Sequence, residues 1–202
     1  MNQLPKRLVL ASNNAHKLQE FSRILAPLGI QVVSQREMGV FVNPEENGNT
    51  FMENAAIKAK AVFDCCGEAT VADDSGLCVD ALQGAPGIYS ARYAGEDATD
   101  DERIAKLLEE LSDVAPEQRG AHFACAICCI LPGGEQLQVY ETCEGTVAMA
   151  KQGDNGFGYD PVFLVEGQSF AQLDGEKKDR ISHRGRALRA FARRLSEIWK
   201  EN

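Results

Sequence analysis

LVLASNNAHK (residues 8–17) joins an apolar run to a polar turn, and a helical pattern follows it. Leu8–Ala11 is short and apolar like a buried strand, and Ser12-Asn13-Asn14 ends it. Apolar residues then recur at helical spacing as far as Gly29, namely Leu18, Phe21, Ile24, Leu25 and Leu28. The pattern predicts a strand, a loop and a helix whose start could bind phosphate through free backbone N–H groups. Plain capping of that helix is the alternative.

Strands and helices alternate early in the chain, and a hairpin lies in its middle. Helices are expected at Thr50–Cys66, at Thr99–Leu111 and from about Ser182 onward. The acidic stretch Asp73-Asp74-Ser75-Gly76 predicts a turn or bend between two strands. The expected fold class is α/β, with a mixed sheet and flanking helices in one domain over 1–202. The further predicted strands are Ile30–Val33, Ala69–Ala72, Leu77–Leu82, His122–Leu131, Leu137–Cys143 and Val162–Val165.

Charge is distributed unevenly along the 202 residues. The net charge of minus 9 argues against nucleic acid or an anionic membrane as the main partner. Residues 177–202 nevertheless hold nine basic and three acidic residues, so this stretch is plus 6 and the rest is minus 15. The asymmetry fits a site where a polyanion meets a metal cation, and a solvated helix face is the alternative.

Cysteine usage and the absence of targeting signals both indicate a reducing cytoplasm. The chain has seven cysteines, and Cys125 and Cys128 form a CxxC inside an apolar run. A zinc site would need a second pair or nearby histidines, so buried reduced thiols are the preferred interpretation. Neither a signal peptide nor a membrane-spanning run is found in the sequence.

Three acidic residues are candidate metal ligands, namely the adjacent pair Asp73 and Asp74 and the separate Glu53. Asp73 and Asp74 follow a buried strand, and neighbouring strand residues point to opposite faces, so only one should face a given site. Carboxylates there suit Mg²⁺, which binds through one or two of them plus substrate phosphates, while an Asx turn is the alternative. Glu53 is a weaker candidate because the capping box Thr50-Phe51-Met52-Glu53 already accounts for it.

The glycine-rich loop, Gly153–Pro161, is the candidate for binding a planar base. Pro161 stands where a dinucleotide-binding loop needs its third glycine, so that class of fold is not supported. Phe157 and Tyr159 lie between glycines and could stack on a base, or they could simply pack inward. Lys178 and the Ser182–Gly185 segment bring cations and a histidine near the start of the last helix.

Six motifs together resemble those of the inosine/xanthosine triphosphate pyrophosphatases. They occur in the family's order and cover nearly the whole chain. Asn13, where many members have glycine, and Asn155, where the loop is often richer in glycine, are departures from the pattern. The motifs are Ala11–Lys17, Thr50–Ala55, Ala72–Leu77, Gly84–Tyr93, Gly156–Pro161 and Ile181–Gly185.

The resemblance implies a Mg²⁺-dependent hydrolase that converts dITP, ITP and XTP to the monophosphate and pyrophosphate. It also implies a homodimer and a two-lobed fold around a central cleft. The metal would be held by Glu53 and Asp74, with Asp74 also the base for the attacking water. The residues implied for substrate binding are Ser12, Asn13, Asn14, Ala15, His16, Lys17 and Lys178 for the phosphates, Ser75, and Phe157, Gly158, Tyr159, Asp160, His183 and Arg184 around the base.

Two other functions stay open from the sequence. One is a related pyrophosphatase that acts on pyrimidine or modified nucleotides, since it needs the same metal and lysines. The other is a nucleic-acid-binding module that uses the basic last helix.

Overall fold

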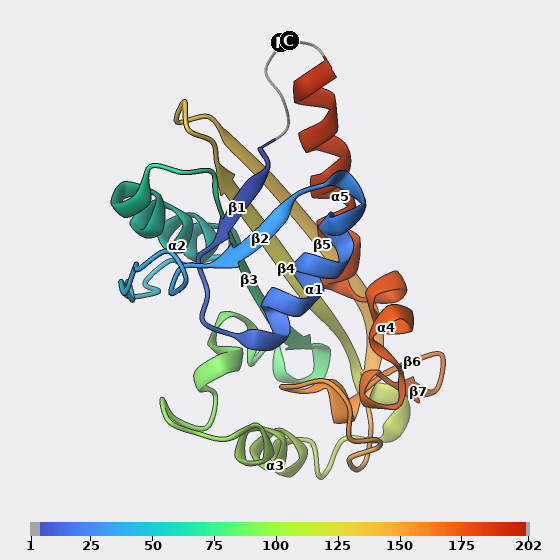
Figure 1. Cartoon of the computed structure of the whole chain (residues 1–202). Coiled ribbons are helices and arrows are strands. Elements are labelled where there is room, and N and C mark those ends of the chain that lie inside the picture. Colours follow the sequence, from blue (N-terminus) through green and yellow to red (C-terminus); the bar gives the residue numbers. More distant parts are fainter. Residues whose placement is uncertain (1–4, 201–202) are drawn as a thin grey trace. The chain divides into compact units, whose positions relative to one another are not determined.

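The computed structural model describes residues 5–200, with side chains described as far as residue 198. Its strands form a seven-stranded sheet in the order β2-β1-β3-β4-β5-β6-β7, and helices accompany it (Figure 1). The strands are β1 (Arg7–Leu10), β2 (Gln31–Ser34), β3 (Thr70–Val79), β4 (Gly120–Ile130), β5 (Gln136–Val147), β6 (Phe163–Val165) and β7 (Gln168–Ser169). The α-helices are α1 (Ala15–Leu25), α2 (Phe51–Cys66), α3 (Asp100–Glu110), α4 (Gly175–Ile181) and α5 (His183–Lys200).

The sheet is mixed, as the sequence predicts. β1 pairs in parallel with β2, where Arg7 lies opposite Gln31, and with β3, where Val9 lies opposite Thr70. β6 pairs antiparallel with both β5 and β7. The parallel pairs come from the early part of the chain, where strands and helices alternate.

The chain divides into two compact units. Unit 1 consists of Met1–Asp74, Cys125–Glu141 and Arg184–Asn202, and unit 2 of Ser75–Ala124 and Thr142–His183. The central cleft that the family resemblance implies stays a prediction, as does a single functional domain over 1–202.

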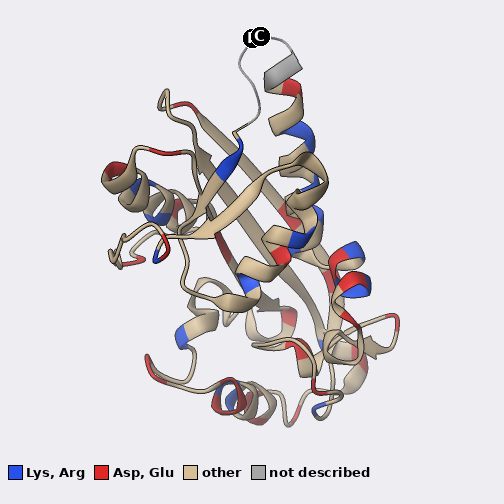
Figure 2. Ribbon diagram, in the orientation of Figure 1, with Lys and Arg blue, Asp and Glu red and all other residues tan. Residues whose placement is uncertain are grey.

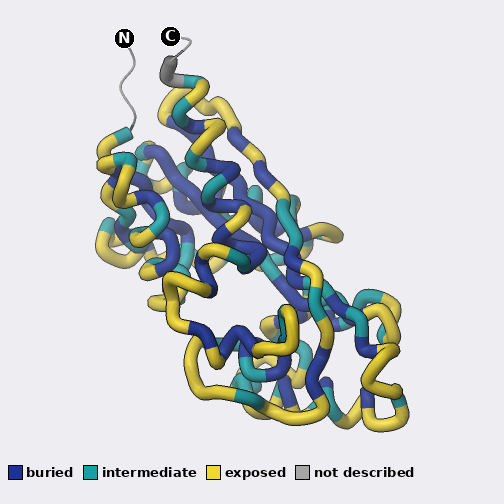
Figure 3. Tube along the Cα trace, turned by 90° about the vertical axis from the view of Figure 1, so that its right-hand side faces the viewer, coloured by how far each residue is buried: buried dark blue, intermediate teal, exposed yellow. Residues whose placement is uncertain are grey.

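Unit 1 has its own apolar core, to which α1 and α5 contribute from opposite ends of the sequence. Figure 1 shows these two helices side by side, in blue and red. Phe21 and Leu25 of α1 pack in one cluster with Leu188 and Phe191 of α5. In Figure 3, α5 lies next to the label C and carries both buried and exposed residues, as expected of an amphipathic helix.

Unit 2 is built around a second core. Ile104 and Leu107 of α3 are buried there with Phe123 of β4 and Phe163 of β6. α3 starts where predicted, because Thr99 and Glu102 form a capping box in which each side chain accepts the other residue's backbone N–H. Local sequence signals thus place this helix correctly.

The predicted turn at Asp73–Gly76 is wrong, since β3 runs without interruption over Thr70–Val79. Two adjacent carboxylates can lie inside a strand here because each has a cationic partner. Asp73 pairs with Lys17 and Arg184, and Asp74 pairs with Lys58. Buried charges are tolerated when they are paired and hydrogen-bonded.

A second difference concerns Lys178, expected at the start of the last helix. It lies instead on α4, a short separate helix that Asp174 caps by accepting the N–H of Lys177. Figure 2 shows Lys and Arg on both α4 and α5. The basic stretch is therefore divided between two helices.

The cysteines serve mainly as small core residues. Cys125, Cys128 and Cys129 of β4 are buried, and burial raises the pKa of each thiol. No cluster of three or more potential metal-ligating side chains occurs within residues 5–198. Among the helices described, none is long and apolar enough to cross a membrane.

Candidate functional site

The loop after β1 is organised by Ser12 and Asn14. The Ser12 hydroxyl accepts the Asn14 N–H at 3.1 Å. The Asn14 side chain then caps α1, accepting the N–H groups of His16 at 2.9 Å and Lys17 at 3.2 Å. The capping alternative therefore holds for Asn14, while Asn13, Ala15 and His16 are exposed on the same loop and helix start.

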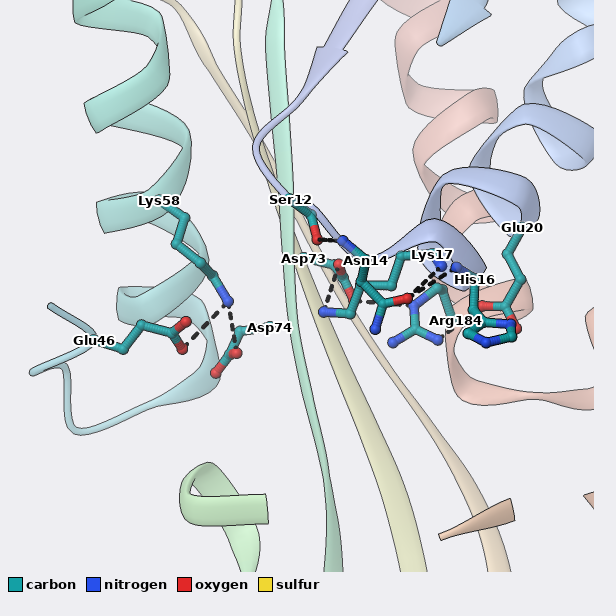
Figure 4. A network of polar contacts seen from close by, with 10 residues as sticks. All are labelled: Ser12, Asn14, His16, Lys17, Glu20, Glu46, Lys58, Asp73, Asp74 and Arg184. Carbon is teal, nitrogen blue, oxygen red and sulfur yellow. Dashed lines mark hydrogen bonds and ion pairs between the residues drawn. The ribbon is translucent and has the colours of Figure 1, made fainter. Parts of the chain in front are cut away.

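Four charged side chains meet beside this loop, and we call them the charge cluster: Lys17, Glu20, Asp73 and Arg184 (Figure 4). Nζ of Lys17 lies 2.9 Å from Oδ1 of Asp73. Arg184 donates from Nε to Oδ2 of Asp73 at 3.0 Å and from Nη1 to Glu20 at 2.8 Å. The cluster holds two positive and two negative groups, so its formal charge is zero.

Burial sets the electrostatics of the charge cluster. Asp73 is 2% exposed and Arg184 is 3% exposed. Burial alone would raise the pKa of Asp73, but attraction by Lys17 and Arg184 outweighs it and holds that pKa well below its ordinary value. Asp73 is therefore a carboxylate throughout the neutral range.

Asp74 points to the other side of β3 and belongs to a second group, the Lys58 group: Asp74, Lys58, Glu46 and Asn54. Nζ of Lys58 lies 2.8 Å from Oδ1 of Asp74 and 3.3 Å from Oε2 of Glu46 (Figure 4). The Asn54 amide donates to Asp74 at 3.4 Å. As expected, the two adjacent aspartates thus serve different surroundings.

The Lys58 group places one cation between two carboxylates. Burial alone would lower the pKa of Lys58, but Asp74 and then Glu46 attract the ammonium and raise it. Lys58 therefore stays protonated, and the two carboxylates already converge on a positive charge.

That arrangement fits a hard divalent cation. Oxygen donors from one or two carboxylates suffice for Mg²⁺ when substrate phosphates and water supply the rest. Glu53 lies on α2, the helix that also carries Asn54 and Lys58. It is exposed in the first turn of that helix, where its Oε2 accepts the Asn49 N–H at 2.6 Å. The contacts of Glu46 therefore match a metal ligand better than those of Glu53.

In unit 2, Asp160 fastens the glycine-rich loop. Its Oδ2 accepts the Phe157 N–H at 2.9 Å and the Lys178 ammonium at 2.6 Å. That ammonium also lies 4.8 Å from the centroid of the Phe157 ring. Gly156 is required here because a Cβ at its position would lie 2.0 Å from Oδ2 of Asp160. The fold thus brings Phe157, Asp160 and Lys178 together.

The remaining predicted residues have diverse surroundings. The Tyr159 hydroxyl donates to the Ser90 carbonyl at 3.0 Å, so this ring packs inward. His183 is buried and stacks on Phe123, with ring centroids 4.4 Å apart. Ser75 is half-buried in β3, directly after Asp74.

Sequence reasoning missed Glu20, Glu46 and Lys58 as members of these groups. Helical spacing offered a partial signal, because Glu20 lies three residues after Lys17 and Lys58 lies four after Asn54, so each pair shares a helix face. Nothing local marks Glu46, which lies in an irregular segment without helix or strand.

Comparison with known proteins gives a consistent result over nearly the whole chain. A model of the Ham1 family matches residues 8–194. A protein of Desulforamulus reducens named dITP/XTP pyrophosphatase is 48% identical over 195 residues, which cover 96% of this chain and 97% of that protein. A Bacillus subtilis protein of the same name is 44% identical, covering 94% and 97%.

Solved structures agree with the sequence matches. The structure of a HAM1 protein from Coxiella burnetii superposes with a TM-score of 0.85 and 43% sequence identity. The match covers 95% of this chain and 98% of that one.

Proposed function

The chain belongs to the Ham1 family, and on that premise we propose that it is a nucleoside triphosphate pyrophosphatase for non-canonical purine nucleotides. The substrates would be dITP, ITP and XTP, cleaved between the α and β phosphates. The observation that carries the proposal is the pairing of Asp74 and Glu46 with the Lys58 ammonium. Asp74 lies on β3 directly after Asp73, which pairs with Lys17. These are the carboxylates and cations that a metal-bound triphosphate needs.

Asp74 is the proposed general base. Water would attack the α phosphorus and lose its proton to the Asp74 carboxylate, while the bond from that phosphorus to the bridging oxygen breaks. The products are the nucleoside monophosphate and pyrophosphate, which leaves with the bonding electrons. Lys58 and Asn54 orient the carboxylate, since both donate to it.

Mg²⁺ is the proposed cofactor, and Asp74 would be one of its ligands. The second carboxylate ligand would be Glu46, which we favour on its contacts, in place of Glu53, which the family resemblance implies. When bound, the ion would polarise phosphate oxygens and neutralise part of the triphosphate charge. A triphosphate carries about four negative charges, so an acidic protein can bind it only with such local compensation.

Lys17 and Lys178 are the proposed phosphate-binding cations, with the Ser12–Lys17 segment and Ser75 in supporting contacts. Lys17 is suited to binding a phosphate because Asp73 anchors its ammonium while its side chain stays 16% exposed. Lys178 is more enclosed, between Asp160 and the Phe157 ring.

The glycine-rich loop is the proposed base-binding element, with Phe157, Gly158, Tyr159 and Asp160 joined by His183 and Arg184. Donors aimed at the 6-oxygen of a keto-purine would face the amino group of adenine, and such mispairing can cost ~10⁴-fold or more. Arg184 contacts Asp73 and Glu20, so a role at the base would come in addition to its place in the charge cluster.

A homodimer and a cytoplasmic location complete the proposal. The dimer is proposed from the family resemblance, and large apolar side chains are exposed in both units, Phe41 and Tyr140 in unit 1 and Tyr89 and Met149 in unit 2. Light scattering on the purified protein should give about twice the chain mass of 22.0 kDa, and the mass of a single chain would contradict the dimer. The net charge of minus 9 supports neither nucleic acid nor membrane as a partner.

One assay panel tests the function. Pyrophosphate release is measured from dITP, ITP, XTP, GTP, ATP and dUTP, each with Mg²⁺ and with EDTA. We expect Mg²⁺-dependent release from the first three. A preference for dUTP would favour the pyrimidine alternative, and no hydrolysis together with salt-sensitive binding to DNA or RNA would favour a nucleic-acid-binding module.

A further inference from the structure

Asp100, the first residue of α3, reaches the glycine-rich loop with its carboxylate. Its Oδ2 accepts the Gly158 N–H at 2.7 Å. Its other oxygen pairs with Arg103, one turn along the same helix. Arg103 donates in turn to the carbonyl of Ala91 at 2.5 Å. Asp100 therefore ties the loop to α3 and, through Arg103, to the segment before it.

The loop has reason to need such a tie. Gly156 and Gly158 both have left-handed backbone, with φ of 78° and 61°. Glycine has the widest conformational freedom of any residue, so ordering this segment has a high entropic cost. Asp160 fixes the loop through Phe157 and Lys178, and Asp100 fixes the amide that follows Phe157.

Helix stability alone does not explain this contact. An acidic residue in the first turn of a helix is favourable anywhere, because it faces the positive end of the helix dipole. Asp101 supplies the same charge one residue later, and its carboxylate pairs with Lys151 at 2.6 Å while remaining 76% exposed. The two neighbours thus differ in whether they hold the Gly158 amide.

We propose that Asp100 is a positioning residue for base selection: its carboxylate holds the Gly158 amide so that Phe157 stays in place against Lys178. This inference rests on the proposed function, in which the loop binds the base. Pre-ordering a binding loop lowers the entropy that ligand binding must otherwise overcome. The hydrogen bond to an ionised acceptor is stronger than a neutral one, so its loss should be measurable.

The test compares D100A with D101A as a matched control, because alanine removes the acceptor of the Gly158 N–H whereas asparagine would keep one. For D100A we expect the ratio of kcat/KM for ITP over ATP to fall about tenfold, the size of one charge-assisted hydrogen bond. The inhibition constant of inosine monophosphate should rise by a similar factor, while that of pyrophosphate changes less than about twofold. The Gly158 amide resonance should shift in D100A and stay in place in D101A.

Two results would overturn the inference. One is a D100A enzyme whose base selectivity equals that of D101A. The other is an equal rise in the inhibition constants of inosine monophosphate and pyrophosphate, as general loosening of the fold would give. If D100A does not fold, D100E carries the same test, because it keeps the charge but moves the carboxylate away from Gly158. Pyrophosphate release by the wild-type enzyme, measured first, judges the proposed function separately.

Discussion

Nζ of Lys17 lies 2.9 Å from Oδ1 of Asp73, so a cation at the start of α1 rests on a carboxylate inside β3. The Lys17 side chain is 16% exposed, whereas those of Arg184 and Glu20 are 3% and 7% exposed. Lys17 is thus the member of the charge cluster most open to a ligand. Asp73 holds its ammonium in place, and Arg184, itself paired with Glu20, holds Asp73.

Asp73→Asn should destabilise the protein by about 3 to 5 kcal/mol, because it leaves Lys17 and Arg184 without their shared buried carboxylate. Urea unfolding measures the change. Asp64→Asn is the control, since Asp64 and Lys60 form an exposed pair whose loss costs little. A loss below about 1 kcal/mol in D73N would mean that the charge cluster contributes no more than a surface pair.

The lowered pKa of Asp73 predicts how the stability of the folded protein depends on pH. The pKa of Asp73 is depressed in the folded state, so its contribution is fully present above its ordinary pKa of 3.8 and is lost as the pH falls toward the folded value. The stability difference between wild type and D73N should therefore be constant from pH 7 to about 4.5 and narrow below about pH 4. Urea titrations at several pH values check this, and a gap that widens in acid would reverse the sign of the argument.

Asp74→Asn should lower turnover by about 10² to 10⁴-fold, the usual contribution of a general base. The fold should survive because Lys58 keeps Glu46 as a partner. Initial rates with ITP give the activity, and circular dichroism with thermal unfolding gives the fold. A well-folded D74N enzyme with wild-type turnover would remove Asp74 as the base.

Glu46→Gln and Glu53→Gln separate the two candidates for the second metal ligand. Since Glu46 shares the Lys58 cation with Asp74, E46Q should raise the Mg²⁺ concentration for half-maximal activity about tenfold, by weakening one charged ligand. E53Q should have little effect, because glutamine keeps an oxygen acceptor for the Asn49 N–H. If E53Q raised the required Mg²⁺ concentration and E46Q did not, Glu53 would be the second metal ligand.

Elements with local signals were predictable from the sequence. The capping residues of α1, α2 and α3 lie where the pattern of polar and apolar residues places them. The uninterrupted course of β3 was not predictable, because the buried carboxylate of Asp73 is paired with Arg184, which is 111 residues away in the chain. Local propensity favours a turn at two aspartates, and tertiary pairing overrides it.

The site shows the same division. Asp74 and Lys17 stand out in short motifs, but Glu46 is brought to Asp74 only by their shared contact with Lys58 in the folded protein. Single-sequence reasoning cannot find such a partner, since Glu46 and Asp74 are 28 residues apart and share no periodic pattern. The assignment of Glu53 followed from its motif, whereas the contacts of Glu46 became visible only in the fold.

The way unit 1 is assembled from three chain segments has a consequence for biosynthesis. Unit 2 ends at His183, so its whole sequence is synthesised before the last segment of unit 1, Arg184–Asn202. Until then Lys17 and Asp73 lack Arg184, and the apolar face of α1 lacks Leu188 and Phe191. The nascent chain therefore exposes part of its first core until α5 has been made, and any premature stop codon before α5 yields a product in which these α5 side chains do not cover α1.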